Sequence, residues 1–276
     1  MMKKIDRPTF VKWAGGKKQL IEQFKQFFPQ EAERYFEPFV GGGAVAFYVI
    51  QKNHLKEIYL SDINEELINC YEVIRGNVEE LIDKLKQHRN NHNKEYYYAI
   101  RELTPEILSK VERASIFIYL NKTCFNGLYR VNSKGKFNVP MGSYKNPSIF
   151  HEDDLRELSK ILKNVKILKM HFEKVSEYAK KGDFIYFDPP YYPLQKGKSF
   201  TSYTKNNFSE KDQIRLAEVF RELDKKGCKV MLSNSDTKFI KELYQGYNIH
   251  IVKAKRMINC DATKRGAINE VVVTNY

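Results

Sequence analysis

Residues 183–193 read DFIYFDPPYYP, and this stretch decides the fold. The four apolar residues 184–187 are typical of a buried strand in an α/β protein. The strand must end near Asp188, because the two prolines that follow cannot donate the hydrogen bonds of a sheet ladder. The stretch therefore predicts a buried strand that presents Asp188 at its carboxyl end.

The residues after this strand have the chemistry to activate an amine. An exocyclic amine of a nucleobase is a poor nucleophile, because its lone pair is delocalised into the ring. The Asp188 carboxylate and the Pro189 carbonyl are two acceptors that could hold the amine hydrogens and aim the lone pair at an electrophile. Pro190 adds no competing N–H, and Tyr191 offers a flat face for a base taken out of a duplex. The alternative is an ordinary strand end followed by a proline turn.

Six further apolar runs alternate with helical patterns along the chain. Seven strand candidates with helices between most of them predict a doubly wound, mainly parallel sheet. We expect the last two candidates to form an antiparallel pair at one side, because residues 256–266 between them show no helical period. The candidates are Tyr35–Val40, Glu57–Asp62, Lys166–Met170, Asp183–Phe187, Lys229–Ser233, Asn248–Lys253 and Glu270–Asn275.

The alternation stops between the second and third strands. Residues 64–164 contain helical patterns and no candidate strand of the main sheet, which predicts a mostly helical module inserted between residues 1–63 and 165–276. Within it, residues 125–147 form a polar segment punctuated by glycines, for which we expect a hairpin or loop. The expected helices are Glu65–Arg75, Val78–Arg89, Glu95–Leu103, Lys110–Cys124 and Glu152–Lys163.

Composition favours a polyanionic partner. The 276 residues hold 47 Lys and Arg against 34 Asp and Glu, a net charge of +13, which makes nucleic acid the leading candidate. No apolar run is long enough to span a membrane, and the first residues lack the features of a signal peptide. The four cysteines show no close pairing, so we expect a reduced, cytoplasmic protein, and we expect a monomer.

We expect no bound metal. His88 and His92 stand four residues apart, which is a possible ligand spacing on a helix. However, the polar residues that flank them are typical of a solvated helix face, and the cysteine spacings form no ligand set.

A glycine turn at residues 41–43 follows the first strand, where backbone can approach a ligand closely. Its three consecutive glycines, with Glu37 just upstream, do not match the GxGxxG spacing that binds a diphosphate. Asp62 ends the second strand, where an acceptor for ribose hydroxyls is expected. A nucleoside without phosphates fits this pattern, and S-adenosylmethionine is the nucleoside that carries an electrophilic methyl group.

Taken in order, seven segments make the chain resemble the Dam-type DNA adenine-N6 methyltransferases, with the closest likeness to the DpnII-type GATC methylases. These are alpha-class amino-methyltransferases, in which a target-recognition module follows the cofactor half. The segments are KWAGGK at 12–17, FEPFVGGGA at 36–44, LSDIN at 60–64, FNGLYRVNSKGKFNVPMGSYKNP at 125–147, DPPYYP at 188–193, SFTSYT at 199–204 and SNSD at 233–236.

The resemblance implies a Rossmann-like S-adenosylmethionine-dependent methyltransferase sheet, with the target-recognition domain at 64–164. It places catalysis at Asp188, Pro189, Pro190 and Tyr191 and implies methylation of adenine in duplex DNA at GATC. The implied cofactor residues are Trp13, Lys17, Glu37, Phe39, Gly41, Gly43, Asp62, Phe172 and Asp188. The implied DNA-binding residues are Lys12, Phe125, Asn126, Leu128, Arg130, Pro140 and Tyr144.

Physical chemistry agrees with part of the implied DNA set. Arg130 can read guanine with two hydrogen bonds in the major groove, while Leu128 and Pro140 offer apolar contact to a thymine methyl. Phe125, where some family members carry tyrosine, would act as a stacking wedge, and Ser143 replaces an arginine found in some relatives.

Other functions remain open from the sequence. They are a DNA-binding module with a degenerate catalytic domain, a methyltransferase acting on cytosine N4, on RNA or on another GAT-containing site, and, least favoured, a nicotinamide oxidoreductase. The intact DPPY and glycine turn oppose the first. Aspartate at 188, instead of the serine frequent in cytosine enzymes, favours adenine.

Overall fold

The computed structural model describes residues 9–52, 55–133, 135–194, 208–255 and 267–276. The SFTSYT segment, Cys260 and the connection at 256–266 lie outside the described residues. Seven strands form one sheet in the order β3-β2-β1-β4-β5-β7-β6. The strands are β1 Arg34–Glu37, β2 Glu57–Asp62, β3 Val165–Lys169, β4 Phe184–Phe187, β5 Lys229–Ser235, β6 Asn248–Lys255 and β7 Ala267–Thr274.

The predicted α/β fold is confirmed. The first five strands are parallel, and β7 runs antiparallel between β5 and β6. The helices are η1 Lys17–Gln19, α1 Ile21–Phe24, η2 Lys25–Phe27, α2 Ala44–Lys52, α3 Glu65–Gly76, α4 Val78–Asn90, α5 Lys94–Glu102, η3 Pro105–Ile107, α6 Lys110–Thr123, η4 Phe125–Gly127, α7 Glu152–Leu162, η5 Phe172–Lys174, α8 Val175–Tyr178, α9 Glu210–Lys225 and α10 Lys238–Leu243.

Alternation of side chains along the strands gives the sheet two apolar faces. On β4, Phe184 and Tyr186 face a core shared with α1, α2 and α3, whereas Ile185 and Phe187 face a second core formed with α8, α9 and α10. All four residues of β4 are buried, as expected of a central parallel strand. The sheet is therefore a middle layer, and β4 lies at its centre.

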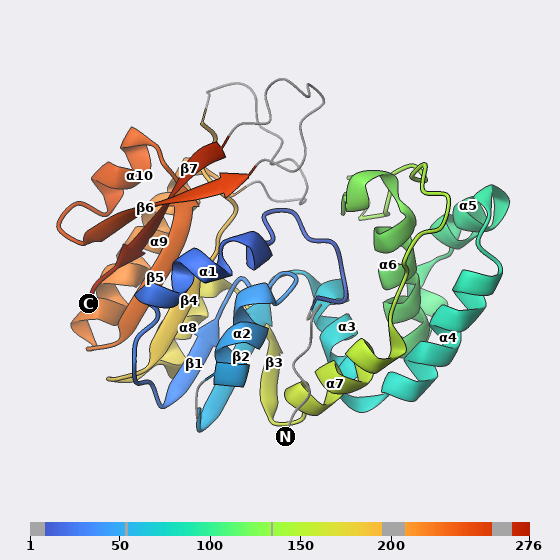
Figure 1. Cartoon of the computed structure of the whole chain (residues 1–276), viewed down its shortest axis with the longest axis horizontal. Coiled ribbons are helices and arrows are strands. Elements are labelled where there is room, and N and C mark those ends of the chain that lie inside the picture. Colours follow the sequence, from blue (N-terminus) through green and yellow to red (C-terminus); the bar gives the residue numbers. More distant parts are fainter. Residues whose placement is uncertain (1–8, 53–54, 134, 195–207, 256–266) are drawn as a thin grey trace.

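Helices α3 to α7 lie beside the sheet, between β2 and β3 in the chain (Figure 1). Their observed bounds match the expected ones to within a residue or so at each end. Between α3 and α7, the described residues pair only as isolated bridges, Cys124 with Met141 and Val131 with Phe137. Helix α3 packs against α6 and also against β3, so the division at residue 64 stays a prediction.

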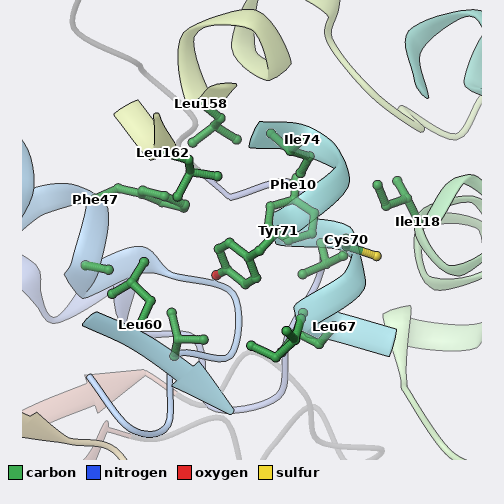
Figure 2. Close-up of a cluster of buried hydrophobic side chains, with 14 of the residues drawn as sticks. Phe10, Phe47, Leu60, Leu67, Cys70, Tyr71, Ile74, Ile118, Leu158 and Leu162 are labelled. Carbon is green, nitrogen blue, oxygen red and sulfur yellow. The ribbon is translucent and has the colours of Figure 1, made fainter. Parts of the chain in front are cut away.

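Tyr71 of α3 packs within the core that joins these helices to the sheet (Figure 2). Its ring meets Phe10 edge to face at 4.9 Å, and its hydroxyl donates to the carbonyl of Gly41 at 2.9 Å. This satisfied buried hydroxyl ties α3 to the turn that follows β1.

His88 does not lie on a solvated face, so that expectation is wrong. It is buried, and both ring nitrogens have partners, Nδ1 with the Tyr96 hydroxyl at 2.8 Å and Nε2 with the Ser115 hydroxyl at 3.1 Å. Burial lowers the pKa of His88 to about 4. His92 pairs with the Tyr119 hydroxyl at 2.8 Å. Tyrosines of the packed helices supply partners that the polar sequence neighbours of these histidines do not reveal. No group of three or more potential metal ligands occurs among the described residues.

Candidate active site and DNA interface

The Asp188 carboxylate follows β4 and has one oxygen engaged. Asp188 Oδ1 accepts from Lys17 Nζ at 2.8 Å and from the Ser233 hydroxyl at 2.9 Å. Within the described part of the chain, Asp188 Oδ2 and the carbonyl of Pro189 accept no hydrogen bond. Two acceptors from consecutive residues thus remain available at one strand end.

Buried and half-buried charged side chains lie around Asp188. Burial raises the pKa of Asp188, and the adjacent Lys17 opposes that rise. Burial also raises the pKa of Glu270 and raises that of Glu37 well above its usual value. Lys17 is itself only 4% exposed and is the positive group acting on all three carboxyls. The low local dielectric makes these interactions strong.

Tyr191 is fixed by two contacts. Its hydroxyl donates to Glu270 Oε2 at 2.8 Å, and Lys17 Nζ lies 4.4 Å from its ring centroid. The carbonyl of Pro190 accepts from Gln213 Nε2 at 2.9 Å. The predicted catalytic residues are therefore held by β7, by α9 and by the segment around Lys17.

The turn after β1 requires glycine. Gly41 and Gly43 have φ of 47° and 73°, in the left-handed region. A Cβ on Gly41 would lie 2.6 Å from the Trp13 ring, and one on Gly43 would lie 2.6 Å from Phe47 and from Tyr71. The Trp13 ring therefore packs directly on the glycine backbone at the carboxyl end of β1.

Asp62 ends β2 beside this turn. Its carboxylate accepts from the backbone N–H of Gly41 at 3.1 Å and of Asn64 at 3.0 Å. Burial nevertheless raises the pKa of Asp62 to about 6. Phe39 stacks on buried Phe172 with ring centroids 5.4 Å apart, which adds an aromatic surface at the same edge.

Glu37, also predicted as a cofactor residue, is buried at the end of β1. Its Oε2 accepts from the Tyr35 hydroxyl at 2.6 Å, and the backbone of Ala46 also bonds to the carboxyl. These bonds link the strand to the start of α2.

The recognition segment, defined as residues 125–144, carries the predicted DNA residues. Phe125 and Tyr144 are 49% and 37% exposed, and Asn126, Arg130 and Pro140 are exposed as well. The Phe125 N–H donates to the Pro140 carbonyl at 2.9 Å, which brings the two ends of the segment together. The segment thus presents a surface of large side chains to solvent.

Arg130 is oriented within this segment. Its Nε donates to Asn138 Oδ1 at 2.7 Å, and its Nη2 donates to the Asn138 carbonyl at 3.3 Å. Lys12 Nζ lies 4.0 Å from the ring centroid of Tyr144. Leu128 is half-buried against the core.

Asn126 adopts a strained backbone. Its φ of 55° makes it the one non-glycine residue with positive φ among the described residues. The next residue, Gly127, leaves room for Lys12, whose side chain would lie 2.4 Å from a Cβ there. Strain at an exposed residue beside a predicted ligand surface is typical of functional segments.

One segment links the two predicted sites. Asn121 of α6 is fully buried; its Oδ1 accepts from the Lys12 N–H at 2.7 Å and its Nδ2 donates to the Lys12 carbonyl at 2.8 Å. The Trp13 ring stacks on Tyr129 at 5.7 Å and on Phe117 at 6.3 Å. Lys12, Trp13 and Lys17 therefore connect the helical module to Asp188.

Sequence reasoning missed several residues of this site. Ser233 and Asn234 lie in the SNSD segment, but the sequence pattern predicted no role for them. Glu270 is a charged residue in an otherwise apolar strand, and this pattern could have marked it as a site residue. Gln213 and Asn121 lie in helices where nothing in the sequence distinguishes them.

Comparison with known proteins gives a consistent family. A family model described as "D12 class N6 adenine-specific DNA methyltransferase" matches residues 13–258. The chain is 51% identical to "Type II methyltransferase M.MjaIII" of Methanocaldococcus jannaschii, with 97% of this chain and 98% of the relative covered. It is 44% identical to "Type II methyltransferase M1.LlaDCHI" of Lactococcus lactis subsp. cremoris, with 99% and 97% covered. A "DNA adenine methylase" of Haemophilus influenzae is 38% identical, with 98% and 94% covered.

Proposed function

Because the chain belongs to the D12 class of N6 adenine-specific DNA methyltransferases, we propose that it transfers a methyl group from S-adenosylmethionine to a flipped-out adenine of duplex DNA at GATC sites. Methylation of adenine N6 in DNA is the activity of the class. The cofactor, the recognition sequence and the roles of individual residues are the proposed parts.

The observation that carries the catalytic proposal is the pair of available acceptors at Asp188 and Pro189. Asp188 Oδ2 accepts one hydrogen of the adenine amine and the Pro189 carbonyl accepts the other, which aims the nitrogen lone pair away from the ring plane. Tyr191 stacks on the flipped base. Burial raises the pKa of Asp188, and the ion pair with Lys17 opposes this rise and so favours the carboxylate form.

The residues at the ends of β1 and β2 suit a nucleoside cofactor. Asp62 provides an ionisable acceptor for ribose hydroxyls, and the bare backbone at Gly41 and Gly43 permits close approach. Phe39 and Phe172 add an aromatic surface, with Trp13 and Glu37 supporting the glycine turn. When bound, S-adenosylmethionine would supply an electrophilic methyl group, its transfer to N6 would leave S-adenosylhomocysteine, and the proton that N6 loses would pass to solvent.

The recognition segment supplies sequence choice, and residues 64–164 form the target-recognition domain. Arg130, oriented by Asn138, reads a guanine, while Leu128 and Pro140 contact a thymine methyl. Phe125 occupies the space that the flipped base leaves. Lys12, Asn126 and Tyr144 complete the DNA surface, and the net charge of +13 favours duplex DNA.

Two measurements on the wild type test this function, with Asp188→Ala as the inactive control. Single-molecule sequencing of DNA from cells expressing the chain should find modified adenine in GATC and in none of its single-base variants. Purified protein with tritiated cofactor should label DNA, and digestion to nucleosides should yield N6-methyl-2′-deoxyadenosine as the one labelled product. Recovery of N4-methylcytosine would contradict the adenine assignment, and modification confined to a longer GAT-containing site would contradict GATC.

A further inference from the structure

The SNSD segment at residues 233–236 has no role in the function proposed above, yet it lies beside the catalytic residues. Strand β5 pairs in parallel with β4, with Phe187 in register with Leu232. The next residues along the two strands are Asp188 and Ser233. Ser233 and Asn234 are both fully buried. Two buried polar side chains at this point need hydrogen-bond partners, and they find them on β4, on the turn that follows it and on α9.

Ser233 determines which oxygen of Asp188 is free. Its hydroxyl donates to Asp188 Oδ1 at 2.9 Å and lies 2.8 Å from the hydroxyl of buried Tyr186. Because a serine hydroxyl has a single hydrogen, Tyr186 must donate to Ser233 when Ser233 donates to Asp188. Oδ1 receives Lys17 as well, so both donors engage the same oxygen. No described residue donates to Oδ2, which can therefore accept from a ligand.

Asn234 and Gln213 determine which carbonyl is free. Asn234 Oδ1 accepts from the Tyr192 N–H at 3.1 Å, and its Nδ2 donates to Gln213 Oε1 at 3.0 Å. Gln213, 1% exposed, donates from Nε2 to the Pro190 carbonyl at 2.9 Å. The Pro190 carbonyl is thereby occupied, and the turn is held at Pro190 and at Tyr192.

We propose that Ser233, Asn234 and Gln213 are positioning residues, which hold the turn after β4 so that Asp188 Oδ2 and the Pro189 carbonyl face the adenine amine as a matched acceptor pair. The inference rests on the proposed function, because it assigns the acceptors used by that reaction. None of the three residues need touch DNA or cofactor. Their substitution should slow methyl transfer and leave the binding of both substrates near wild type.

Ser233→Ala tests the first contact. We expect the single-turnover rate to fall about tenfold to a hundredfold, because a hydrogen bond to a charged group is lost. Affinities for DNA and cofactor should change less than about threefold, and Ser233→Thr, which keeps a hydroxyl, should recover most of the rate. Thr274→Val is the matched control, because it removes a buried strand hydroxyl that donates to Tyr276 at 3.1 Å, away from the site.

The pH profile separates positioning from general packing. Ser233 donates to the ionised form of Asp188, so its loss favours the protonated acid. The acid limb of the single-turnover rate should therefore move to higher pH in Ser233→Ala and return in Ser233→Thr. Other ionisable groups around Asp188 are Lys17, Glu37 of β1, Glu270 of β7 and the tyrosines Tyr35, Tyr186 and Tyr191. These groups are present in every variant, so the informative quantity is the shift of the acid limb of each variant relative to that of the wild type.

Gln213→Met tests the second contact, because it keeps the side-chain length and removes the donor to Pro190. We expect a fall of about tenfold in single-turnover rate with a KM for DNA near wild type. Asn69→Leu is the matched control: it removes a buried amide whose Nδ2 donates to the Lys110 carbonyl at 2.9 Å in the helical module. Thermal unfolding of each variant establishes that it is folded at the assay temperature.

The outcomes distinguish this inference from the proposed function. An active Asp188→Ala would refute the catalytic assignment itself. An inactive Asp188→Ala together with wild-type rates and pH profiles for Ser233→Ala and Gln213→Met would overturn the positioning role alone. A rate loss in Ser233→Ala that Thr fails to restore, with an unmoved acid limb, would also overturn it.

Discussion

The groups around Asp188 and the recognition segment differ in how they are held. Glu37, Lys17 and Ser233 are buried at the ends of sheet strands or on the segment packed against them, whereas Phe125 and Arg130 are exposed on irregular backbone. Burial strengthens electrostatic interactions and fixes geometry, which suits a reaction that depends on alignment. Exposure leaves side chains available to contact a partner, and replacing an exposed side chain changes the stability of the fold little. Substitutions in the first region should therefore alter rate, and those in the second should alter sequence choice.

The largest effect is expected from Asp188→Ala. Single-turnover methylation should fall by more than about a thousandfold, because a fixed acceptor for the reacting amine is lost. DNA binding should survive, since the recognition segment is untouched. Rapid-quench measurements with tritiated cofactor test the rate, and fluorescence anisotropy tests the binding. If Asp188→Ala keeps more than about a tenth of the wild-type rate, the region around Asp188 does not control the rate and the contrast with the recognition segment fails.

Asp62→Ala should chiefly weaken the cofactor. Loss of a charge-assisted bond to ribose, about 1.5 to 3 kcal/mol, corresponds to a rise in Kd of about tenfold to 150-fold, and saturating cofactor should restore turnover. Glu57→Gln, at the opposite end of the same strand, is the control. Calorimetry that finds equal cofactor affinity in Asp62→Ala and wild type would exclude the contact.

Arg130→Ala should relax sequence choice by about 1 to 3 kcal/mol, the discrimination carried by an arginine paired with guanine. Methylation of GATC and of each single-base variant should be compared for wild type and mutant. Lys136→Ala removes an exposed cation of the same segment, paired with Glu102 at 2.6 Å, and should leave the ranking of sequences unchanged. If Arg130→Ala slows all sequences equally, Arg130 contacts phosphate instead of a base.

The smallest expected effect is the pH dependence of cofactor binding. The pKa of Asp62 is raised to about 6, so the carboxylate is mostly ionised at pH 7 and protonated below pH 6. A protonated acid is the poorer acceptor, so affinity should be constant above about pH 7, fall as the pH passes through about 6, and level off at lower pH near the affinity of Asp62→Ala. Asp62→Asn should abolish this dependence. Titration calorimetry between pH 5 and 8 measures it, and a wild-type profile that is flat down to pH 5 would contradict the role of Asp62.

The sheet was predictable from the sequence because its signals are local. The apolar run of β4 ends at two prolines, and the helices of the inserted module follow a clear 3.6-residue period. His88 shows the limit: its polar neighbours indicate solvent, but Tyr96 and Ser115 approach from other helices and bury it.

The candidate site was predictable where a residue carries its own chemistry, as Asp188 and Asp62 do. It was not predictable where a residue acts through a distant partner. Gln213 lies 23 residues beyond Pro190, in an amphipathic helix where glutamine is unremarkable until the two meet in space. The roles of Lys12 and Asn121 likewise depend on a contact between residues 109 apart.

The position of β7 has a consequence for how the protein is made. Strand β7 follows β6 in the chain but lies between β5 and β6, and among the described strands β6 pairs only with β7. Strand β6 can therefore join the sheet only through residues 267–274. The same strand delivers Glu270 to Tyr191. A nascent chain that already contains Asp188, the glycine turn and the whole recognition segment would still lack this support for Tyr191, so the proposed catalytic site would be completed only after the proposed DNA-reading residues were in place.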